Sequence, residues 1–226
     1  MFPSLRAAWK PGSRESPEPL SGYCLRSRRA GRRRAAWFDE QARIGACLRG
    51  LAANGPEVGE ILVCDGGSRD GTAEVVRAFA ASDARVRLID AAPVPEGWNG
   101  KAWGLDAGLR NANGAATWIA SVDADVIAGP GLFAAMSAHA SARGVDALSV
   151  ATRQIVPDAP SALLHASMLA TLVYRFGIPR RGARRVSDVQ ANGQCFRVLR
   201  AAPLALGALL TVRESRCEYV TLARAL

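Results

Sequence analysis

The sequence predicts an α/β fold in which a mostly parallel sheet carries helices on both faces. Between Glu40 and Ala151, short apolar runs that favour strands alternate with segments of helical period. The connections between them are short, and such alternation produces parallel strands covered by helices. Ligands in these sheets bind beyond the carboxyl ends of the strands, so polar residues at those ends are the first candidates for a site.

The expected helices have an apolar side and end at residues that break helices. In the first, Ile44, Cys47, Leu48 and Leu51 fall at helical spacing, and the Asn-Gly-Pro run at 54–56 ends it. Four further helices are expected over residues 72–81, 101–109, 132–142 and 163–176. The last is apolar but too short to cross a bilayer. It fits a core helix, which we prefer, or a helix that lies against a membrane surface.

Three acidic residues follow two of the expected strands. The strands are expected over residues 60–64, 86–89, 117–122 and 147–151. Asp65 follows the first strand, and Asp123 and Asp125 follow the third. Because the carboxyl ends of parallel strands meet at one edge of a sheet, these carboxylates are expected on the same edge. Two acidic motifs at one edge are less readily explained as turns than either motif alone.

The composition is that of a globular protein with a basic N-terminal segment. The chain has 226 residues, of which 49% are apolar and 22% charged. Residues 1–36 have no helical or strand period, and we expect a disordered tail there. Nine basic and two acidic residues in it account for +7 of the net charge of +9. No nucleic-acid partner is therefore expected, although an RNA-binding protein that uses the tail stays an alternative.

No segment of the sequence indicates secretion or a membrane span. No apolar run reaches the roughly 20 residues that cross a bilayer, and the N-terminus lacks the apolar core of a secretory signal. The five scattered cysteines indicate ordinary thiols, not a disulfide framework or a zinc site. These features predict a cytoplasmic protein, or one at the cytoplasmic face of the membrane.

The Asp123-Ala124-Asp125 stretch is a candidate metal site. In an extended backbone, residues two apart project to the same side, so both carboxylates can converge on one ligand. Two close carboxylates repel each other unless a divalent cation lies between them and a polyanion. The alternative is an Asp-rich turn that ends the strand. The shared edge with Asp65 favours the metal site.

Two further segments point to a phosphorylated ligand. The loop over residues 64–72 joins a strand to a helix, and its glycines let backbone N–H groups approach a ligand. It is neither the Rossmann fingerprint nor a P-loop. Asp65 within it suits a ribose hydroxyl or a base N–H. Lys101, in a loop that enters a helix, is placed to neutralise a diphosphate, or is a solvated surface lysine.

Four segments in order resemble the family 2 glycosyltransferases, which have the GT-A fold. They are Asp39-Glu40 with the helix after it, Asp65–Thr72, Lys101–Gly108, and Asp123-Ala124-Asp125. Together they cover about residues 39–130. The sequence of residues 95–101 is similar to that of hopanoid- or carotenoid-associated members. We expect a nucleotide-sugar-binding half over residues 37–130 and an acceptor-side half over 131–226.

The resemblance implies roles for the donor-side residues. Glu40 belongs to the first nucleotide-loop motif, Asp65 contacts the nucleoside, and Lys101 contacts the pyrophosphate. Asp123 approaches the ribose and sugar, and Asp125 holds Mg²⁺ or Mn²⁺ against the diphosphate. The metal acts as a Lewis acid on the departing nucleoside diphosphate. The implied partners are a nucleotide diphosphate-sugar, most readily a UDP-sugar, and a lipid or glycan hydroxyl, with peripheral membrane contact.

The acceptor side matches the family less closely. Inverting members deprotonate the acceptor hydroxyl with a carboxylate base. The segment at 218–223 resembles the one that carries it, but Tyr219 stands where an aspartate is expected, which leaves Glu218 as the candidate. Tyrosine, with a pKa of about 10, is a poor base at neutral pH. The residues that resemble the acceptor-side Gly-rich loop are Gln190, Asn192, Gly193 and Gln194.

Both ends of the chain depart from the family pattern. Residues 32–38 are a poor strand where members open with an apolar one, and the chain stops where relatives continue. A truncated or frame-disturbed reading of a longer protein would explain both. One rival hypothesis is a nucleotide-sugar-binding module with weak catalysis. Another is a nucleotidyltransferase, which the lack of a Gly-rich, basic N-terminal loop disfavours.

Overall fold

The computed structural model of the chain describes residues 20–21, 23–26, 40–156, 158–176, 186, 189–207, 209–215 and 217–226. The elements in its first half are β1 (Leu20–Ser21), β2 (Tyr23–Arg26), α1 (Gln41–Ala52), β3 (Val58–Asp65), α2 (Thr72–Ser82), β4 (Val86–Asp90) and α3 (Gly100–Asn111). Those in its second half are β5 (Trp118–Asp123), α4 (Leu132–Arg143), β6 (Ala147–Val150), α5 (Ala159–Phe176), β7 (Cys195–Leu199), α6 (Ala201–Ala205), η3 (Leu210–Val212) and α7 (Glu218–Ala225).

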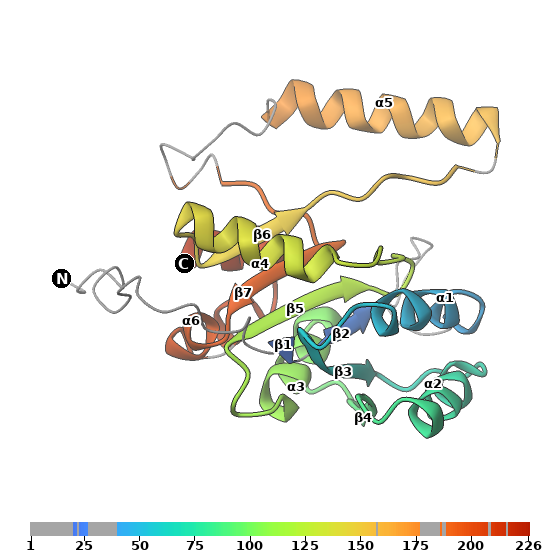
Figure 1. Cartoon of the computed structure of the whole chain (residues 1–226). Coiled ribbons are helices and arrows are strands. Elements are labelled where there is room, and N and C mark those ends of the chain that lie inside the picture. Colours follow the sequence, from blue (N-terminus) through green and yellow to red (C-terminus); the bar gives the residue numbers. More distant parts are fainter. Residues whose placement is uncertain are drawn as a thin grey trace.

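The strands form a mixed sheet that is parallel in its first part. β3 pairs in parallel with β1 and β4, and β2 pairs in parallel with β5. β2 also lies beside β3, so β1 and β2 together occupy the space between β3 and β5 (Figure 1). β7 runs antiparallel to both β5 and β6. The carboxyl ends of β3, β4 and β5 consequently share one edge of the sheet.

The structure confirms the alternation predicted between residues 40 and 151. Each helix and strand expected there is present, with bounds that differ by a few residues. Three strands were not predicted. β1 and β2 lie within residues 1–36, which the sequence analysis assigned to a tail, and β7 follows the segment expected as a Gly-rich loop. β1 and β2 are short and flanked by polar, Pro-rich sequence, so no local pattern indicates them.

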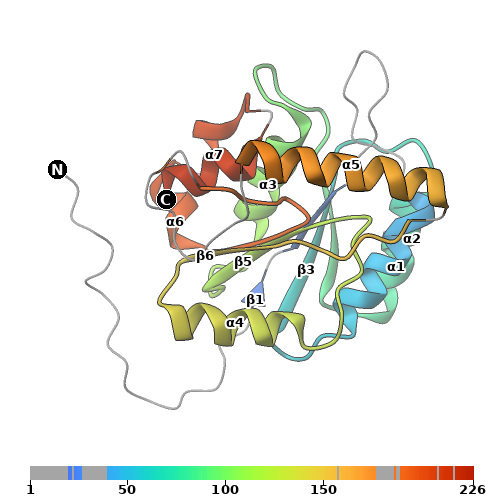
Figure 2. The ribbon, with the colours of Figure 1, turned by 90° about the horizontal axis from the view of Figure 1, so that it is seen from above.

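Helices cover both faces of the sheet, each over its own apolar cluster. On one face α1 and α4 contribute Leu48 and Phe133, which pack with Val122 of β5. On the other face the side chains of α3 and α7 pack against Phe196 of β7. Viewed from above, α4 lies on one side of the sheet and α3 and α7 on the other (Figure 2). The alternating side chains of β5 thereby contact both clusters.

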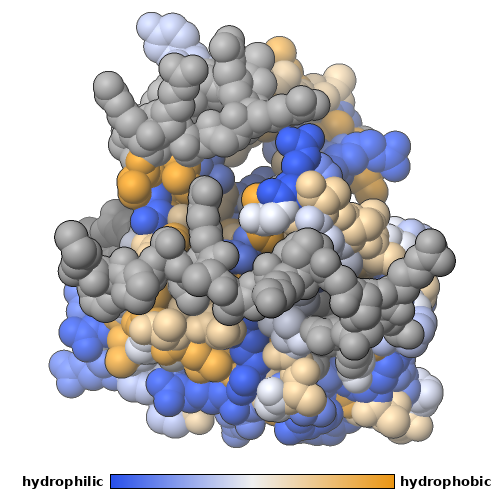
Figure 3. Space-filling view, turned by 60° about the vertical axis from the view of Figure 1, so that its left-hand side comes forward, coloured by the Kyte–Doolittle hydropathy of each residue, from blue (hydrophilic) through white to orange (hydrophobic). Residues whose placement is uncertain are grey.

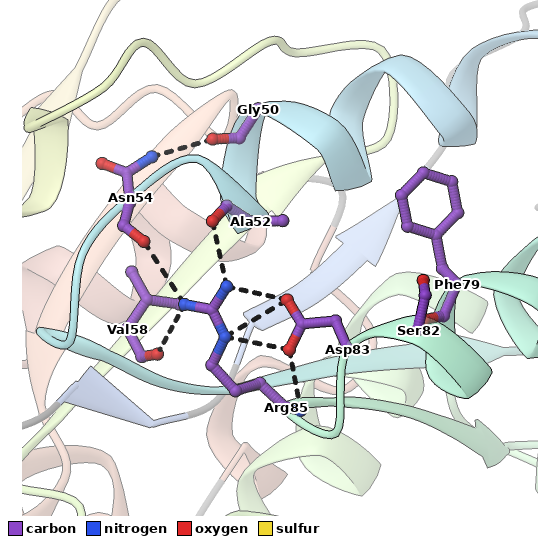
Figure 4. Close-up of polar contacts among 8 residues, drawn as sticks. All are labelled: Gly50, Ala52, Asn54, Val58, Phe79, Ser82, Asp83 and Arg85. Atoms are coloured by element: carbon purple, nitrogen blue, oxygen red, sulfur yellow. Dashed lines mark hydrogen bonds and ion pairs between the residues drawn. The ribbon is translucent and has the colours of Figure 1, made fainter.

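Arg85 ties together the opposite end of the sheet. Its guanidinium donates to the carbonyl oxygens of Ala52 at 2.9 Å and of Asn54 and Val58 at 3.3 Å. The same group pairs with Asp83 at 2.7 Å (Figure 4). Carbonyls at the end of α1, which lack partners within the helix, are satisfied in this way. Arg85 therefore fixes α1 relative to β3 and β4.

α5 lies apart from the other helices. In Figure 1 it lies above the sheet and separated from it, and in Figure 2, seen from above, it crosses in front of the other elements. Figure 3 shows apolar side chains on the surface at the top of the molecule, where α5 lies. Among the described residues it has no extensive contact with another helix or strand. The preferred expectation of a core helix is therefore wrong. A search of the described helices found none with the length and apolar character that a membrane crossing requires.

Candidate active site

The loop after β3 is held against the N-terminus of α1. The backbone N–H of Glu40 donates to Thr72 Oγ1 at 2.9 Å, and that of Gln41 donates to Asp70 Oδ2 at 3.0 Å. In return, the Gln41 side chain accepts from the Gly71 N–H at 3.1 Å. Two segments that the sequence analysis placed on the donor side are thus joined directly. Glu40 is buried, and its carboxylate lies 3.6 Å from Arg43.

Asp65 shapes the turn that leaves the sheet. One carboxylate oxygen accepts from Ser68 N–H at 2.9 Å, from Ser68 Oγ at 2.6 Å and from Gly67 N–H at 3.3 Å. Asp65 stands opposite Asp90 in the β3–β4 register. Both side chains therefore lie at the carboxyl edge of the sheet, and the backbone N–H groups of residues 67 and 68 are gathered around the first of them.

Asp123 and Asp125 differ in their surroundings. Asp123 ends β5 and is 2% exposed, whereas Asp125 is exposed. The N–H of Val126 donates to the Asp123 carbonyl at 3.0 Å, so the two aspartates lie in a turn. The extended backbone assumed in the sequence analysis is wrong for this step. The turn nevertheless leaves one carboxylate at the sheet and the other at the surface two residues later.

Lys101 is a buried cation at the start of α3. The Asn99 side chain caps this helix by accepting from the N–H groups of Lys101 and Ala102 at 2.9 Å and 2.8 Å. Lys101 Nζ lies 2.6 Å from Glu218 Oε1 and 4.0 Å from Asp123 Oδ1. The solvated-lysine alternative is therefore wrong. Three residues predicted separately for the site, on α3, β5 and α7, meet within one cluster.

Tyr219 packs against this cluster. Its ring lies 4.5 Å from Lys101 Nζ, and its hydroxyl forms a hydrogen bond with Ser121 of β5. A Cβ placed on Gly193 would lie 2.6 Å from Cδ2 of the Tyr219 ring, still closer to Cε2, and 3.0 Å from Lys101 Nζ. Only glycine therefore fits at position 193. From the sequence, Tyr219 stands only in the place of an expected base, and nothing marks Ser121. No local pattern places these two residues together.

The loop at residues 189–194 borders Asp123. The Asp123 N–H donates to the Gln194 carbonyl at 3.1 Å. Asn192 donates through its N–H to Ser149 Oγ at 2.6 Å and through Nδ2 to Gln194 Oε1 at 2.8 Å. Gln190 is half-buried in the same loop. Gln194 thus contacts the carboxyl end of β5 directly, and Ser149 of β6 holds Asn192 beside Gln194.

Buried thiols surround the inner side of the Asp123 turn. The Cys47 thiol donates to the Asp123 carbonyl at 3.7 Å. Burial, and then the charges of Asp125 and Asp123, raise the pKa of Cys47 far above its ordinary range. Burial and Asp123 also raise the pKa of Cys195 to about 12. Burial therefore keeps both thiols protonated at neutral pH in this structure.

The donor set of the Asp123 turn fits a hard divalent cation. It consists of two carboxylates, one buried and one exposed, and carboxylate oxygens are preferred by Mg²⁺ and Mn²⁺. Among the residues that the structure describes, no three His, Cys, Asp or Glu side chains are grouped to hold a metal ion. Such a pair is sufficient for a cation whose other ligands are phosphate oxygens and water. The residues present therefore fit a metal that arrives with a diphosphate.

Comparison with known proteins gives a family and several similar folds. The model of glycosyl transferase family 2 matches residues 36–205. TarS 1–349 from S. aureus is 13% identical, with a TM-score of 0.58 over 92% of this chain and 55% of that chain. A Pyrobaculum calidifontis mannosyltransferase in complex with GDP-Man and Mn²⁺ is 18% identical, with a TM-score of 0.56 over 90% and 51% of the respective chains.

A further solved structure is similar over less of the chain. Glucosyl-3-phosphoglycerate synthase from Mycobacterium tuberculosis, in complex with Mn²⁺, UDP and glucosyl-3-phosphoglycerate, is 18% identical, with a TM-score of 0.50 over 82% and 58% of the respective chains. No curated protein matches the sequence. The chain spans about half the length of these solved structures. The likenesses show an α/β, GT-A-like fold.

Proposed function

Because the chain belongs to glycosyl transferase family 2, we propose that it transfers a sugar from a nucleotide diphosphate-sugar to a hydroxyl group. One observation carries the proposal. Lys101 Nζ lies 4.0 Å from Asp123, at the sheet edge that also carries Asp65. A cation and two carboxylates at one edge of the sheet, at the carboxyl ends of β3 and β5, suit a ligand that combines hydroxyl groups with a diphosphate.

On the donor side, Asp65 and Glu40 serve the nucleoside. The N–H groups around Asp65 and the interlocked N-terminus of α1 give this part of the edge a fixed shape. A fixed carboxylate recognises ribose hydroxyl or base N–H groups. A UDP-sugar is the donor we propose first. Complexes of two similar folds with GDP-Man and with UDP, each with Mn²⁺, support a nucleotide donor.

Asp125 is the proposed metal ligand, with Asp123 beside the ribose and sugar. The exposed position of Asp125 allows a hydrated Mg²⁺ or Mn²⁺ to approach together with the diphosphate. When bound, the metal supplies a Lewis acid for the departing diphosphate. Asp123 is held by the Gln194 carbonyl through its own N–H, so its carboxylate is fixed at the end of β5. Lys101 adds a positive charge on the same side.

On the acceptor side, Glu218 is the proposed general base for an inverting transfer. It opens α7, and its partner Lys101 lies next to Gly193 of the acceptor-side loop. A lipid or glycan hydroxyl is the acceptor we propose. In the structure Glu218 is paired with Lys101 at 2.6 Å. Diphosphate oxygens that draw the Lys101 ammonium toward the donor would release the carboxylate for proton transfer.

The same ion pair favours a second candidate function. If Glu218 stays paired with Lys101 when donor is bound, neither Glu218 nor Tyr219, whose hydroxyl is buried against Ser121, is available as a base. The chain would then bind nucleotide sugars but catalyse transfer weakly.

Calorimetric titration with UDP and Mn²⁺, set beside a turnover assay with a UDP-sugar, tests both functions. Metal-dependent UDP binding together with release of UDP from the sugar donor supports the transferase. Binding without turnover supports a nucleotide-sugar-binding module with weak catalysis. The absence of UDP and GDP binding, with or without Mn²⁺, would overturn both. Pyrophosphate release from a nucleoside triphosphate would instead indicate a nucleotidyltransferase.

A further inference from the structure

We infer that α5 binds the surface of a bilayer that contains anionic lipids. The inference deepens the proposed function and rests on it in one respect, since a lipid acceptor has to be reached at a membrane. It is carried by the exposure of the helix, by its separation from the core, and by the charge of the sequence around it.

Several described side chains of α5 are apolar and exposed to water. Leu163 is 72% exposed, Leu164 is 67% exposed and Tyr174 is 93% exposed. Leu163 and Tyr174 are eleven residues apart, which is about three turns, so they lie on the same face of the helix. Met168 and Leu169 add further exposed apolar surface. A contiguous patch of this kind on a protein surface marks an interaction site.

Few of the described α5 side chains are buried even in part. Ser161, Ala162 and His165 are half-buried, and the other described side chains of the helix are exposed. None of the three is a large apolar side chain. The N-terminus of the helix is closed by Asp158, which accepts from the Ser161 N–H at 2.7 Å. α5 is thus capped locally, and its described apolar residues lie outside the core.

The charge pattern selects an anionic lipid surface as the partner. Residues 159–185 contain no Asp or Glu and five arginines, at positions 175, 180, 181, 184 and 185. An apolar helix face next to a basic segment matches the boundary between acyl chains and anionic headgroups. A second copy of the chain would bring like charges together. RNA would satisfy the arginines but offers no apolar phase for Leu163 and Leu164.

The position of α5 suits a lipid acceptor. In Figure 1 the helix lies above the sheet, and one of its ends is on the side of the molecule on which β3 and β5 end. That edge carries Asp65 and Asp123. A bilayer bound at that end of α5 would therefore come near the candidate active site.

Co-sedimentation of the full chain with vesicles tests the inference. We expect binding to vesicles of phosphatidylcholine mixed with phosphatidylglycerol, and much weaker binding to phosphatidylcholine alone. The L163E/L164E variant should bind the mixed vesicles at least about tenfold more weakly, because two charges would enter the acyl boundary. Leu210→Glu, at a residue that is 50% exposed outside α5, is the matched control and should bind as the wild type does.

Two results would overturn the inference. One is equal binding of L163E/L164E and wild type to mixed vesicles. The other is no wild-type binding to them, including the case in which sedimentation velocity shows an α5-dependent dimer. Because α5 contributes little to the core, L163E/L164E should keep the wild-type melting temperature and UDP titration. Loss of vesicle binding with UDP binding intact separates the membrane surface from the donor site.

Discussion

The Lys101 ammonium lies 2.6 Å from the Glu218 carboxylate although 117 positions separate the two residues in the sequence. Both side chains are buried, at 7% and 5% exposure. Asp123 lies 4.0 Å from the same ammonium. One cation therefore compensates two carboxylates that come from the two halves of the chain. This arrangement joins the proposed donor side to the proposed acceptor side.

The first prediction concerns the stability of this pair. Removing one partner of a buried ion pair costs about 3–5 kcal/mol, because the remaining charge stays buried. Lys101→Met leaves Glu218 and Asp123 together without their cation, so we expect a loss at the upper end of that range. Glu218→Gln leaves the ammonium near Asp123, and we expect a loss at the lower end. Urea unfolding measures both.

The double variant K101M/E218Q separates pairing from other effects. We expect its loss of unfolding free energy to be smaller than the sum of the two single losses, as for residues in direct contact. Additive losses would contradict a direct interaction. Arg77→Ala, which removes an exposed ion pair with Glu74, is the reference and should change the unfolding free energy by no more than about 0.5 kcal/mol.

The second prediction concerns the metal. Asp125→Asn should abolish the Mn²⁺-dependent part of UDP affinity, because it removes the exposed carboxylate proposed to hold the cation against the diphosphate. The melting temperature should stay unchanged, since the side chain lies outside the core. Calorimetry with and without Mn²⁺ measures the effect. Asp146→Asn, at another exposed aspartate, is the matched control. Unchanged Mn²⁺ dependence in Asp125→Asn would refute the assignment.

The third prediction concerns Arg85 at the far end of the sheet. Arg85→Met removes the donors to the Ala52, Asn54 and Val58 carbonyls and the partner of Asp83 (Figure 4). We expect the unfolding free energy to fall by about 2–3 kcal/mol, because several partly buried acceptors lose their partners at once. Urea unfolding checks this, with Arg77→Ala again as the exposed reference. A loss of unfolding free energy no larger than that of the reference would contradict the role of Arg85 in fixing α1 relative to β3 and β4.

The fourth prediction concerns the pH dependence of the stability that the Arg85–Asp83 pair provides. Arg85 holds the pKa of Asp83 below its ordinary value of 3.8. It does so through its side-chain hydrogen bond, the hydrogen bond from its backbone N–H and its charge, which together outweigh the effect of burial. A lowered pKa stabilises the folded state above pH 3.8, and that contribution is lost as the pH falls through the folded-state pKa. Unfolding measured across pH should therefore show that the difference between wild type and Asp83→Asn shrinks below that pH. A constant difference would exclude this contribution.

The sequence predicts the alternating part of the fold well, because burial there has a local period. Leu48 and Leu51 on α1, or the apolar run before Asp65, are visible from spacing alone. β7 was missed because its strand contains the buried Arg197, which stacks 3.8 Å from the Trp118 ring and conceals the apolar pattern. β1 and β2 depend on partners far along the chain, which no local pattern contains.

The residues proposed for the site could be named from local patterns, but their contacts could not. Asp65, Asp123 and Lys101 were proposed because strand ends and helix starts share an edge of the sheet. That Lys101 is paired with Glu218, and that Tyr219 closes the cluster, depends on where α7 packs. Such contacts are fixed by tertiary packing, so sequence spacing alone does not indicate them.

The fifth prediction concerns the contact between Gly193 and Tyr219. Gly193→Ala would place a methyl group 2.6 Å from Cδ2 of the Tyr219 ring and 3.0 Å from Lys101 Nζ, both closer than van der Waals contact. The ring lies between Lys101 and Ser121, so it has no room to retreat. We expect the unfolding free energy to fall by about 1–3 kcal/mol, the usual cost of overpacking. Gly114→Ala, where an added Cβ meets nothing within 4 Å, is the control.

A second substitution distinguishes this clash from a general effect of alanine in the loop. Tyr219→Leu in the Gly193→Ala background removes the ring atoms that the methyl group would meet. We expect the added cost of Gly193→Ala to be smaller in that background than in the wild type, because the two residues are in direct contact. Urea unfolding of the four proteins in the cycle measures the coupling. Equal costs in both backgrounds would show that Gly193 is needed for its backbone and not for the space that Tyr219 occupies.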